Sequence, residues 1–552
     1  MPSIRIPPPR DGSVTLPEAV DYHRKHHPDR PVFFFHSDGN PDVTEISFLE
    51  FARATDRVGH YLRPRREGPE KQVVALIALS DSLLYQAVTL GIMRAGMIPY
   101  PISPRNTAAA TVELLKDAGC HRLVTTRETL RPLIDEVEKL LASSLYELAL
   151  EEMPPLLEIF PKLGYEKEED PFQLYPGSSR PPLDDILMYL HSSGSTGLPK
   201  TIPQTFRTMV HWASFPPITD VRDYKVQLRQ AGMPLPAFHT LGIITHLLCG
   251  FYGMVPIGLY PPIATTPQAQ PMMPTPQNIL EHTARTKCNS MIIIPALLQI
   301  WASDEKAVKF LSTLEYVGFS GGAVPTKLGN FMTESGVYIT PVYGATEFGS
   351  PTHLIRSEAD ATDWEYIKFS EDISVHWVPQ GDGTFECHFL TCETHQVSVE
   401  NLPDVKGYSS NDLWIPHPTK KYFWKIIGRK DDVIVHTSGE KTVPAPMEDV
   451  LMSSPYIMGV VIFGRDHDAT GVLVELKPQY AIDVNDEQEV AKARNLLWPI
   501  VEEANKVGPA FSRIFKEMIL FVSQDKPFPR AGKGTVMRKA ALQAYETEIE
   551  DM

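Results

Sequence analysis

The eleven residues LHSSGSTGLPK, at positions 190–200, bring three serines, a threonine, two glycines and a lysine into one short stretch. The apolar residues 186–189 come directly before it, which predicts a buried strand that ends in a loop. Glycine lets backbone N–H groups approach an anion closely, while hydroxyl and lysine side chains add donors and positive charge. The stretch therefore predicts a loop that holds phosphate.

Two common phosphate motifs do not fit this loop. A Walker A loop places its lysine directly after the second glycine, whereas Lys200 lies three places after Gly197. A dinucleotide fingerprint must open a helix, and Pro199 stands where that helix would continue. A polar linker and a phosphate loop of another kind remain as alternatives.

The bulk properties favour a soluble protein with more than one domain. A chain of 552 residues is too long for one ordinary core, and 43% hydrophobic with 22% charged residues is typical of globular proteins. A net charge of −16 disfavours a nucleic acid partner. The apolar runs are too short to span a membrane, and the first residues lack a signal-peptide pattern. Five cysteines without a CxxC pair favour a reducing compartment, so we expect a cytoplasmic protein.

Alternating strand and helix patterns predict an α/β architecture. Residues 72–79, 121–126 and 290–296 have the pattern of buried strands, and residues 81–95 have that of a helix. From about residue 386 the pattern changes to short β-like runs at 387–394, 396–402 and 422–428. Beyond them, helices near 447–452 and 487–506 and strands at 459–464 and 471–475 are expected. We therefore predict a domain over residues 1–428 and a small α+β domain over residues 429–552.

Six further motifs follow the loop in a fixed order. They are MPLPAFHTLG (233–242), GFSGGAVP (318–325), VYGATEFG (342–349), YSSNDLW (408–414), GRKDDVI (428–434) and PRAGKGTVMRKA (529–540). Together with residues 190–200 they resemble the adenylate-forming superfamily, which includes acyl- and aryl-CoA ligases, luciferases and the adenylation domains of nonribosomal peptide synthetases. The resemblance implies a large N-terminal adenylate-forming domain of layered mixed and parallel sheets with helices, followed by a mobile α+β domain.

The resemblance also assigns a nucleotide site that binds ATP. The loop would hold the β- and γ-phosphates, Asp412 the two ribose hydroxyls, and Arg429 the ribose or phosphate. Where the superfamily usually has Thr-Gly-Asp, this chain has Ser410-Asn411-Asp412. Adenine would lie against Gly321, Gly322 and Ala323, next to Tyr343 and Gly344. The loop residues implied are Ser192, Ser193, Gly194, Ser195, Thr196, Gly197 and Lys200.

Four residues would carry the reaction itself. Thr346 would donate to the α-phosphate, and Glu347 would bind Mg²⁺, because a carboxylate beside phosphate oxygens needs a cation between them. Lys533 would be the catalytic lysine that bridges the attacking carboxylate and the α-phosphate. Asp431 occupies the hinge position of the superfamily, at the end of an element where a few dihedral angles can absorb a rotation.

The acid is expected to lack an α-amino group. Adenylation domains that load α-amino acids carry an aspartate near the position of Phe238, whereas this chain has Phe238-His239-Thr240. A buried ammonium without a partner is costly. We therefore expect Phe238 and His239 to line the pocket of an aryl or other non-amino acid, with His239 also expected as a catalytic residue that contacts the substrate.

The amino-acid sequence at residues 99–106, 191–200 and 531–540 most resembles that of the adenylation domains of fungal carboxylic acid reductases. This implies transfer of the acyl group to the phosphopantetheine of a carrier (thiolation) domain, and a reductase domain as a further partner. A free-standing aryl- or acyl-CoA ligase and a non-catalytic scaffold that binds nucleotide are the alternatives.

Overall fold

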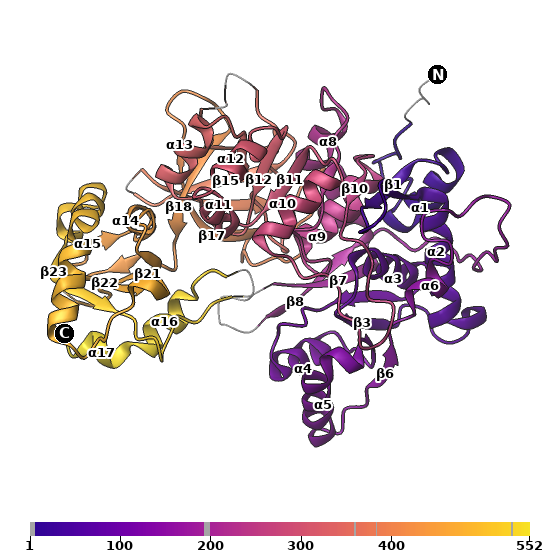
Figure 1. Cartoon of the computed structure of the whole chain (residues 1–552), viewed down its shortest axis with the longest axis horizontal. Helices are drawn as coiled ribbons and strands as arrows, with labels where there is room; N and C mark the ends of the chain where they lie inside the picture. The colour runs from indigo at the N-terminus through magenta and orange to yellow at the C-terminus, as the bar shows by residue number, and fades with distance from the viewer. Residues whose placement is uncertain are drawn as a thin grey trace.

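The structure is a computed structural model that describes residues 6–192, 199–357, 360, 362–381, 383–467, 469–531 and 534–552. Figure 1 shows a large body formed by most of the chain and a smaller lobe at its C-terminal end. Within the described residues, no helix has the length and apolar character needed to cross a membrane.

The largest sheet has seven strands in the order β13-β12-β11-β9-β10-β1-β2. All neighbours pair in parallel except β1 and β2, which are antiparallel. This matches the predicted parallel α/β character. The strands are β1 (Pro31–Phe35), β2 (Thr44–Ser47), β9 (Gln230–Ala231), β10 (Ile257–Gly258), β11 (Ser290–Ile293), β12 (Tyr316–Phe319) and β13 (Ile339–Pro341).

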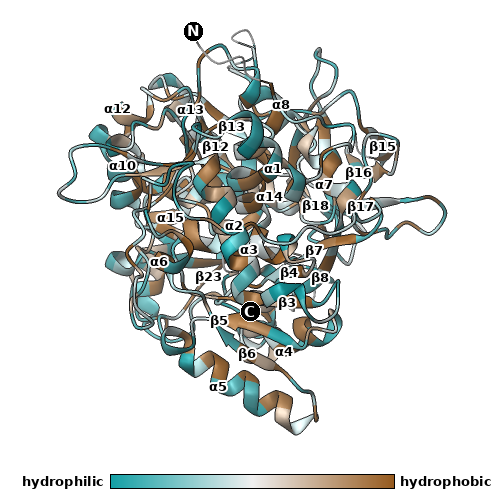
Figure 2. Ribbon diagram, turned by 90° about the vertical axis from the view of Figure 1, so that its right-hand side faces the viewer, coloured by the Kyte–Doolittle hydropathy of each residue, from teal (hydrophilic) through white to brown (hydrophobic). Residues whose placement is uncertain are grey.

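A second, four-stranded parallel sheet has the order β4-β3-β5-β6. Its helix α5 (Arg127–Ser143) buries Leu130, Ile134, Val137 and Leu141, a helical spacing that leaves the opposite face polar (Figure 2). The strands and other helices are β3 (Val73–Ile77), β4 (Ile98–Pro101), β5 (Arg122–Thr125), β6 (Ala149–Glu152), α3 (Ser82–Arg94) and α4 (Ala108–Asp117). The strand and the helix predicted at residues 72–79 and 81–95 are confirmed as β3 and α3.

A hairpin and an antiparallel sheet complete the large body. The hairpin joins β7 (Ile186–Ser192) to β8 (Lys200–Thr205), and the five-stranded sheet has the order β14-β18-β17-β16-β15. Its strands are β14 (Ile367–Lys368), β15 (Ser374–Pro379), β16 (Phe385–Leu390), β17 (Gly407–Pro416) and β18 (Phe423–Arg429). The remaining helices are α1 (Leu16–His26), α2 (Phe48–Leu62), η1 (Pro64–Arg66), α6 (Leu156–Ile159), α7 (Phe206–Ala213), α8 (Pro216–Arg222), α9 (Thr240–Ile243), the π-helix η2 (Ile244–Cys249), α10 (Pro276–Arg285), α11 (Pro295–Trp301), α12 (Glu305–Leu311) and α13 (Thr326–Glu334).

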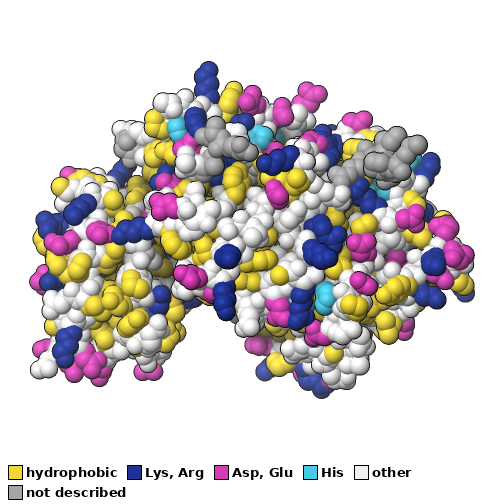
Figure 3. Space-filling model, turned by 45° about the horizontal axis from the view of Figure 1, so that its top comes forward, with side chains coloured by type: hydrophobic (Ala, Val, Ile, Leu, Met, Phe, Trp, Pro, Cys, Tyr) yellow, Lys and Arg dark blue, Asp and Glu magenta, His cyan; other side chains and the backbone are white. Residues whose placement is uncertain are grey.

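The C-terminal lobe is α+β, as predicted. A sheet of order β21-β22-β23 packs with α14 and α15 around one apolar cluster. Figure 3 shows a hollow between this lobe and the large body along one edge. The elements are β19 (Ile434–Val435), β20 (Lys441–Thr442), α14 (Ala445–Met452), β21 (Ile457–Phe463), β22 (Thr470–Leu476), η4 (Pro478–Tyr480), α15 (Glu487–Val507), η5 (Ala510–Ser512), β23 (Ile514–Phe521), α16 (Arg538–Ala544) and α17 (Glu546–Glu550). The domain boundary between residues 428 and 429 stays a prediction.

One local expectation is wrong, and one strand was not predicted. Residues 396–402, expected as a β-like run, form no strand. Their backbone serves tertiary contacts instead, because Gln396 N–H donates to His211 Nδ1 and Ser398 N–H to the Glu347 carbonyl. The strand β23 was not predicted, although it pairs in parallel with β22 and completes the sheet of the small lobe.

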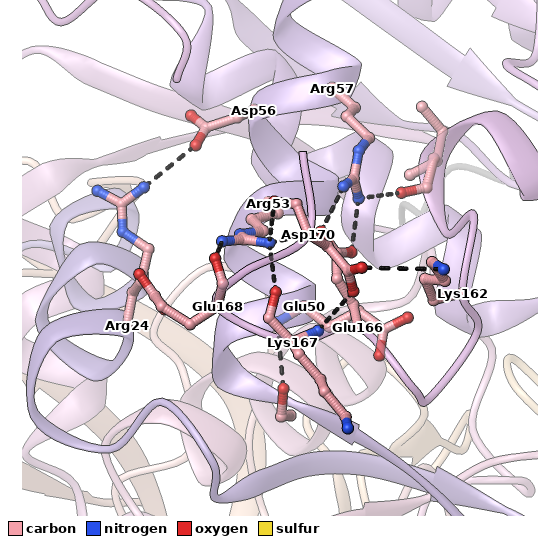
Figure 4. Close-up of polar contacts among 12 residues, drawn as sticks. Arg24, Glu50, Arg53, Asp56, Arg57, Lys162, Glu166, Lys167, Glu168 and Asp170 are labelled. Carbon is pink, nitrogen blue, oxygen red and sulfur yellow. Dashed lines mark hydrogen bonds and ion pairs between the residues drawn. The ribbon is translucent and has the colours of Figure 1, made fainter. Parts of the chain in front are cut away.

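A buried charge cluster fastens the segment around residues 159–170 to helix α2 (Figure 4). Arg53 donates to the carbonyls of Lys167 and Glu168, both at 2.8 Å, and Arg57 Nη1 donates to Glu166 Oε2 at 2.9 Å. The Glu166 side chain is only 1% exposed, so it depends on these two guanidinium groups for its hydrogen bonds. The cluster is structural and lies apart from the motifs described above.

Candidate active site

The predicted phosphate loop is the tip of the β7–β8 hairpin. Ser192 ends β7 and lies directly opposite Lys200, which begins β8 with an exposed side chain. The remaining predicted loop residues, Ser193, Gly194, Ser195, Thr196 and Gly197, lie outside the described residues. The hairpin therefore fixes both ends of the loop.

Two side-chain contacts hold the base of this hairpin to β4 and to the segment that follows it. His191 Nε2 accepts a hydrogen bond from Ser103 N–H at 3.1 Å, and the Tyr100 and Thr201 hydroxyls are 2.9 Å apart. Burial, followed by the nearby His239, lowers the pKa of His191 to about 4, so the ring is a neutral acceptor near pH 7. His191 stands in the predicted motif but was not predicted to have a role of its own.

The VYGATEFG motif forms a tight turn directly after β13. Ala345 N–H donates to the Gly349 carbonyl at 3.0 Å, and Gly349 N–H donates back to Ala345 at 2.8 Å. Gly349 needs its positive φ of 75°, and a Cβ at Gly344 would lie 2.4 Å from the Gly349 carbonyl oxygen. The turn thus projects Thr346 and Glu347 from one rigid point.

Thr346 connects the predicted nucleotide and acid sites. Its hydroxyl lies 2.8 Å from the hydroxyl of Thr240, the residue after His239. Its carbonyl accepts from Gln204 Nε2 at 2.8 Å, and Ser398 donates to Gln204 Oε1 at 2.6 Å. Gln204 was missed, although the alternation along β8 places it on the same buried face as Ile202.

Glu347, the predicted magnesium ligand, has a half-buried side chain close to Tyr408. Burial, and then the Glu347 carboxylate, raise the pKa of Tyr408. Among the described residues, His, Cys, Asp and Glu do not gather in threes as a self-sufficient metal site. A single carboxylate fits Mg²⁺, which commonly takes one or two protein carboxylates and completes its shell with phosphate and water.

Asp412 and Tyr343 meet at the edge of the antiparallel sheet. The Tyr343 hydroxyl donates to Asp412 Oδ2 at 2.6 Å, and its ring packs edge-on against Trp414 with centroids 4.7 Å apart. Burial raises the pKa of Asp412 to about 6, while Tyr343 and Arg429 oppose the shift. The predicted ribose and adenine residues are therefore in direct contact.

The unusual Ser-Asn-Asp sequence inside β17 has a structural explanation. Asn411 has a φ of 58°, in the left-handed region that glycine occupies most easily and asparagine tolerates better than most residues. Its carbonyl accepts from Lys430 N–H at 2.7 Å, and Asp412 N–H donates to Ser410 Oγ at 3.1 Å. Asparagine thus keeps the turn that glycine would form.

The predicted adenine and lysine motifs come together from the two lobes. Gly321 to Ala323 are exposed after β12, and a Cβ at Gly322 would lie 3.6 Å from Thr535 Cγ2. Thr535 is two residues after Lys533, which itself lies outside the described residues. The loop is anchored where Ala531 N–H donates to the Thr535 carbonyl at 2.9 Å and Arg530 pairs with Glu475.

The predicted hinge residue lies between two anchors in different lobes. Lys430 pairs with Glu386 of the large body at 2.7 Å, whereas Asp432 faces Arg538 of the small lobe at 3.5 Å. Asp431 itself binds Arg429, with Nε–Oδ1 at 2.8 Å. A rotation about Asp431 would leave both anchors intact.

The predicted acid residues lie at the start of helix α9. His239 is exposed and is the N-cap of this helix, where its Nδ1 accepts from Leu241 N–H at 3.3 Å. Phe238 is half-buried against the main core. Three side chains that hydrogen-bond to residues 232–240, here called loop 232–240, are uncharged near pH 7: the Gln86 amide, the His246 imidazole and the Thr346 hydroxyl.

Comparison with known proteins finds family models that match both parts of the chain. Residues 20–369 match the family model of the AMP-binding enzymes, and residues 431–552 match that of the AMP-binding enzyme C-terminal domain. Over 546 residues the chain is 46% identical to the adenylate-forming reductase Nps11 of Serpula lacrymans, with 98% of this chain and 50% of that protein aligned. It is 30% identical over 527 residues to a carboxylic acid reductase of Neurospora crassa, covering 92% of this chain and 47% of the relative.

A solved structure gives the same fold. The adenylation domain of a carboxylate reductase from Mycobacterium chelonae superposes with a TM-score of 0.71 at 12% identity, covering 98% of this chain and 91% of that one. The fold and site thus define a two-domain adenylate-forming enzyme. The chain belongs to the AMP-binding enzyme family, and the resemblance seen in its motifs is confirmed. It spans about half the length of the curated relatives it matches.

Proposed function

We propose that this chain activates a carboxylic acid with ATP. A carboxylate oxygen of the acid attacks the α-phosphorus, the bond to the bridging oxygen of the β-phosphate breaks, and pyrophosphate leaves with that electron pair. The product is an acyl adenylate. The 2.8 Å contact between Thr240 and Thr346 carries this proposal, because it puts the predicted acid-binding residues beside the predicted α-phosphate residue.

The nucleotide is assigned to residues of both lobes. Asp412 accepts hydrogen bonds from the ribose hydroxyls, and Thr346 donates a hydrogen bond to the α-phosphate. The exposed backbone at Gly321 and Gly322 takes the face of adenine. Mg²⁺, when held by Glu347, neutralises phosphate charge. Lys533, two residues before Thr535 in the sequence, would offset the negative charge that develops as two anions meet.

The acid is proposed to be aryl or otherwise free of an α-ammonium group. The Gln86 and His246 side chains that bind loop 232–240 are neutral, so neither gives a buried ammonium a counter-charge. The half-buried Phe238 offers an apolar contact, and the imidazole of His239 can meet the substrate carboxylate.

The second half-reaction is proposed to be transfer to a carrier domain. The phosphopantetheine thiol loses its proton and attacks the acyl carbon, and AMP leaves as the thioester forms. The relatives named as reductases are about twice as long as this chain, which supports carrier and reductase domains as its partners. Rotation about Asp431 would withdraw Lys533 and admit the thiol.

Acid-dependent exchange of pyrophosphate into ATP tests the first half-reaction. The panel contains benzoic, cinnamic, fatty, α-keto and α-amino acids, each with Mg²⁺. Exchange with a non-amino acid is expected, and exchange with α-amino acids alone would overturn the assignment of Phe238 and His239. Coenzyme A and a phosphopantetheinylated carrier domain, offered in parallel, then identify the thiol acceptor.

The catalytic lysine has its own test. Lys533→Ala should abolish exchange while ATP still binds, since the lysine acts on the charge that develops during transfer. Lys539→Ala, in the same basic stretch, is the matched control and should keep exchange. Undiminished exchange by Lys533→Ala would assign catalysis to another residue.

A further inference from the structure

Loop 232–240, which carries the predicted acid residues, is held from behind by two buried polar side chains. Gln86 lies on α3 and His246 in the π-helix η2, and each is 0% exposed. Gln86 Nε2 donates to the Ala237 carbonyl at 3.2 Å and contacts His246 Nδ1 at 3.1 Å. His246 Nε2 reaches the Gly232 carbonyl at 3.1 Å. The two side chains thus bind the loop through hydrogen bonds to two of its backbone carbonyls.

The hydrogen-bonding partners determine how the Gln86 amide is oriented and which ring nitrogen of His246 carries the proton. The Gln86 amide nitrogen must face Ala237, because two carbonyl-type oxygens would repel each other, so both of its N–H groups are used. His246 Nδ1 must then accept, and the ring proton stays on Nε2 to donate to Gly232. Burial lowers the pKa of His246 to about 4, which agrees with a neutral ring. Gln86 Oε1 is buried without a hydrogen-bond partner.

The two carbonyls bracket the part of the loop that turns toward the site. Leu235 N–H donates to the Gly232 carbonyl at 3.1 Å, so Gly232 carries two hydrogen bonds. Ala237 is followed at once by Phe238 and His239. The fit is close, because a Cβ at Gly232 would lie 2.9 Å from His246 Nε2.

We propose that Gln86 and His246 are positioning residues for the acid substrate. They do not touch the acid; they fix the backbone from which Phe238 and His239 contact it. This inference rests on the proposed function of those two residues. A displacement of the loop by a fraction of an ångström would loosen the acid pocket and leave the nucleotide contact of Asp412 in place.

Gln86→Met is the first test variant. Methionine keeps the length of the side chain and removes the donors, and the lost oxygen had no partner to begin with. Loss of one or two buried hydrogen bonds should raise KM for the acid roughly five- to tenfold, with KM for ATP changed less than about twofold. Thr89→Val is the matched control: Thr89 is also 0% exposed on α3, but its hydroxyl bonds only within the helix, to Tyr85.

His246 gives a second, graded test. A glutamine amide offers an accepting oxygen and a donating nitrogen, as the neutral imidazole does, so His246→Gln should retain most of the affinity for the acid, whereas His246→Leu should behave like Gln86→Met. Equal losses in His246→Gln and His246→Leu, or parallel changes in KM for acid and ATP, would overturn the positioning role. So would a Gln86→Met enzyme with unchanged KM for the acid. Absence of acid-dependent exchange in the wild type would instead reject the proposed function itself.

Discussion

Arg429 and Asp431 form a two-point ion pair where β18 ends, with Nε–Oδ1 at 2.8 Å and Nη2–Oδ2 at 3.1 Å. Arg429 also lies opposite Asp412 in the register of β17 and β18. The residue predicted to reach the nucleotide is therefore bound to the residue predicted to be the hinge. A nucleotide that engages Arg429 must compete with Asp431 for the same guanidinium group.

This competition predicts the effect of Asp431→Asn. Without the carboxylate, Arg429 is free to turn toward the nucleotide, and affinity for AMP should rise about two- to fivefold, in keeping with a partly exposed ion pair. Isothermal titration calorimetry measures the change. A fall in affinity would mean that Arg429 does not contact the nucleotide.

Nucleotide binding should also depend on pH through Asp412. Its pKa of about 6 means that the carboxyl takes up a proton as the pH falls from 7 to 5, and a protonated carboxyl accepts fewer hydrogen bonds from ribose. Affinity for AMP should therefore drop about tenfold over this range. The Asp412→Asn protein binds weakly throughout and controls for titration of the ligand. Parallel pH profiles for the two proteins would exclude Asp412 as the ribose ligand.

The same pKa has the opposite consequence for folding. Because the pKa of folded Asp412 lies above its ordinary value of 3.8, the contribution of this group to the free energy of unfolding is fully present below pH 4 and is lost as the pH rises through about 6. Low pH thus stabilises the fold through Asp412, whereas it weakens the binding of the nucleotide.

Much of the fold was predictable because it rests on local patterns. The sequence of residues 72–104 has the pattern of two buried strands with an apolar helix between them. The structure has β3, α3 and β4 at these positions. Residues 396–402 alternate like a strand, but their backbone donors are taken by His211 and Glu347, which no local pattern reveals. β23 escaped prediction because its partner β22 lies some forty residues earlier in the chain.

The residues of the candidate site likewise divide into those that a local motif predicts and those that it does not. Thr346, Asp412 and Asp431 could be named because each stands in a motif with a fixed spacing. Gln86 and His246 stand in no motif, and their role depends on contacts that span 151 and 160 residues along the chain. Such positioning residues become visible only when distant segments pack together.

The two lobes are fastened by a helix cap that crosses between them. Helix α13 begins after Pro325, which provides no side-chain cap, and Thr326 N–H donates instead to both carboxyl oxygens of Asp449 on α14, each at 3.2 Å. Nearby, Lys327 pairs with Glu503, but both of those side chains are about half exposed. The cap should therefore contribute more than the ion pair.

Asp449→Ala should accordingly slow adenylate formation. Loss of the cap disfavours the orientation in which Thr535 lies against Gly322, and the rate of pyrophosphate exchange should fall about three- to tenfold. Glu503→Gln is the control and should change the rate less than about twofold. Thioester formation from preformed adenylate should be unaffected by either substitution. Equal effects of the two variants on exchange would show that the cap has no special role.

The buried carboxyl of Glu50 gives a prediction for stability. Gly164 N–H donates to its two oxygens at 2.9 and 3.0 Å, and burial, with the nearby Glu166 as a further cause, raises the pKa of Glu50 from 4.5 to about 7 (Figure 4). The pKa in the folded protein is raised, so the stabilising contribution is fully present below about pH 4.5 and is lost as the pH rises through 7. Above pH 7 a charged group is held in the core.

Glu50→Gln removes this charge and keeps an oxygen that can accept from Gly164. The melting temperature of the variant should equal that of the wild type within about a degree at pH 5 and exceed it by roughly 2–4 °C at pH 8, as followed by circular dichroism. Glu168→Gln makes the same charge change on an exposed side chain of the same segment and should leave the pH profile of the wild type unchanged. If Glu50→Gln and the wild type lose stability in parallel between pH 5 and pH 8, the Glu50 carboxyl is not the group that titrates.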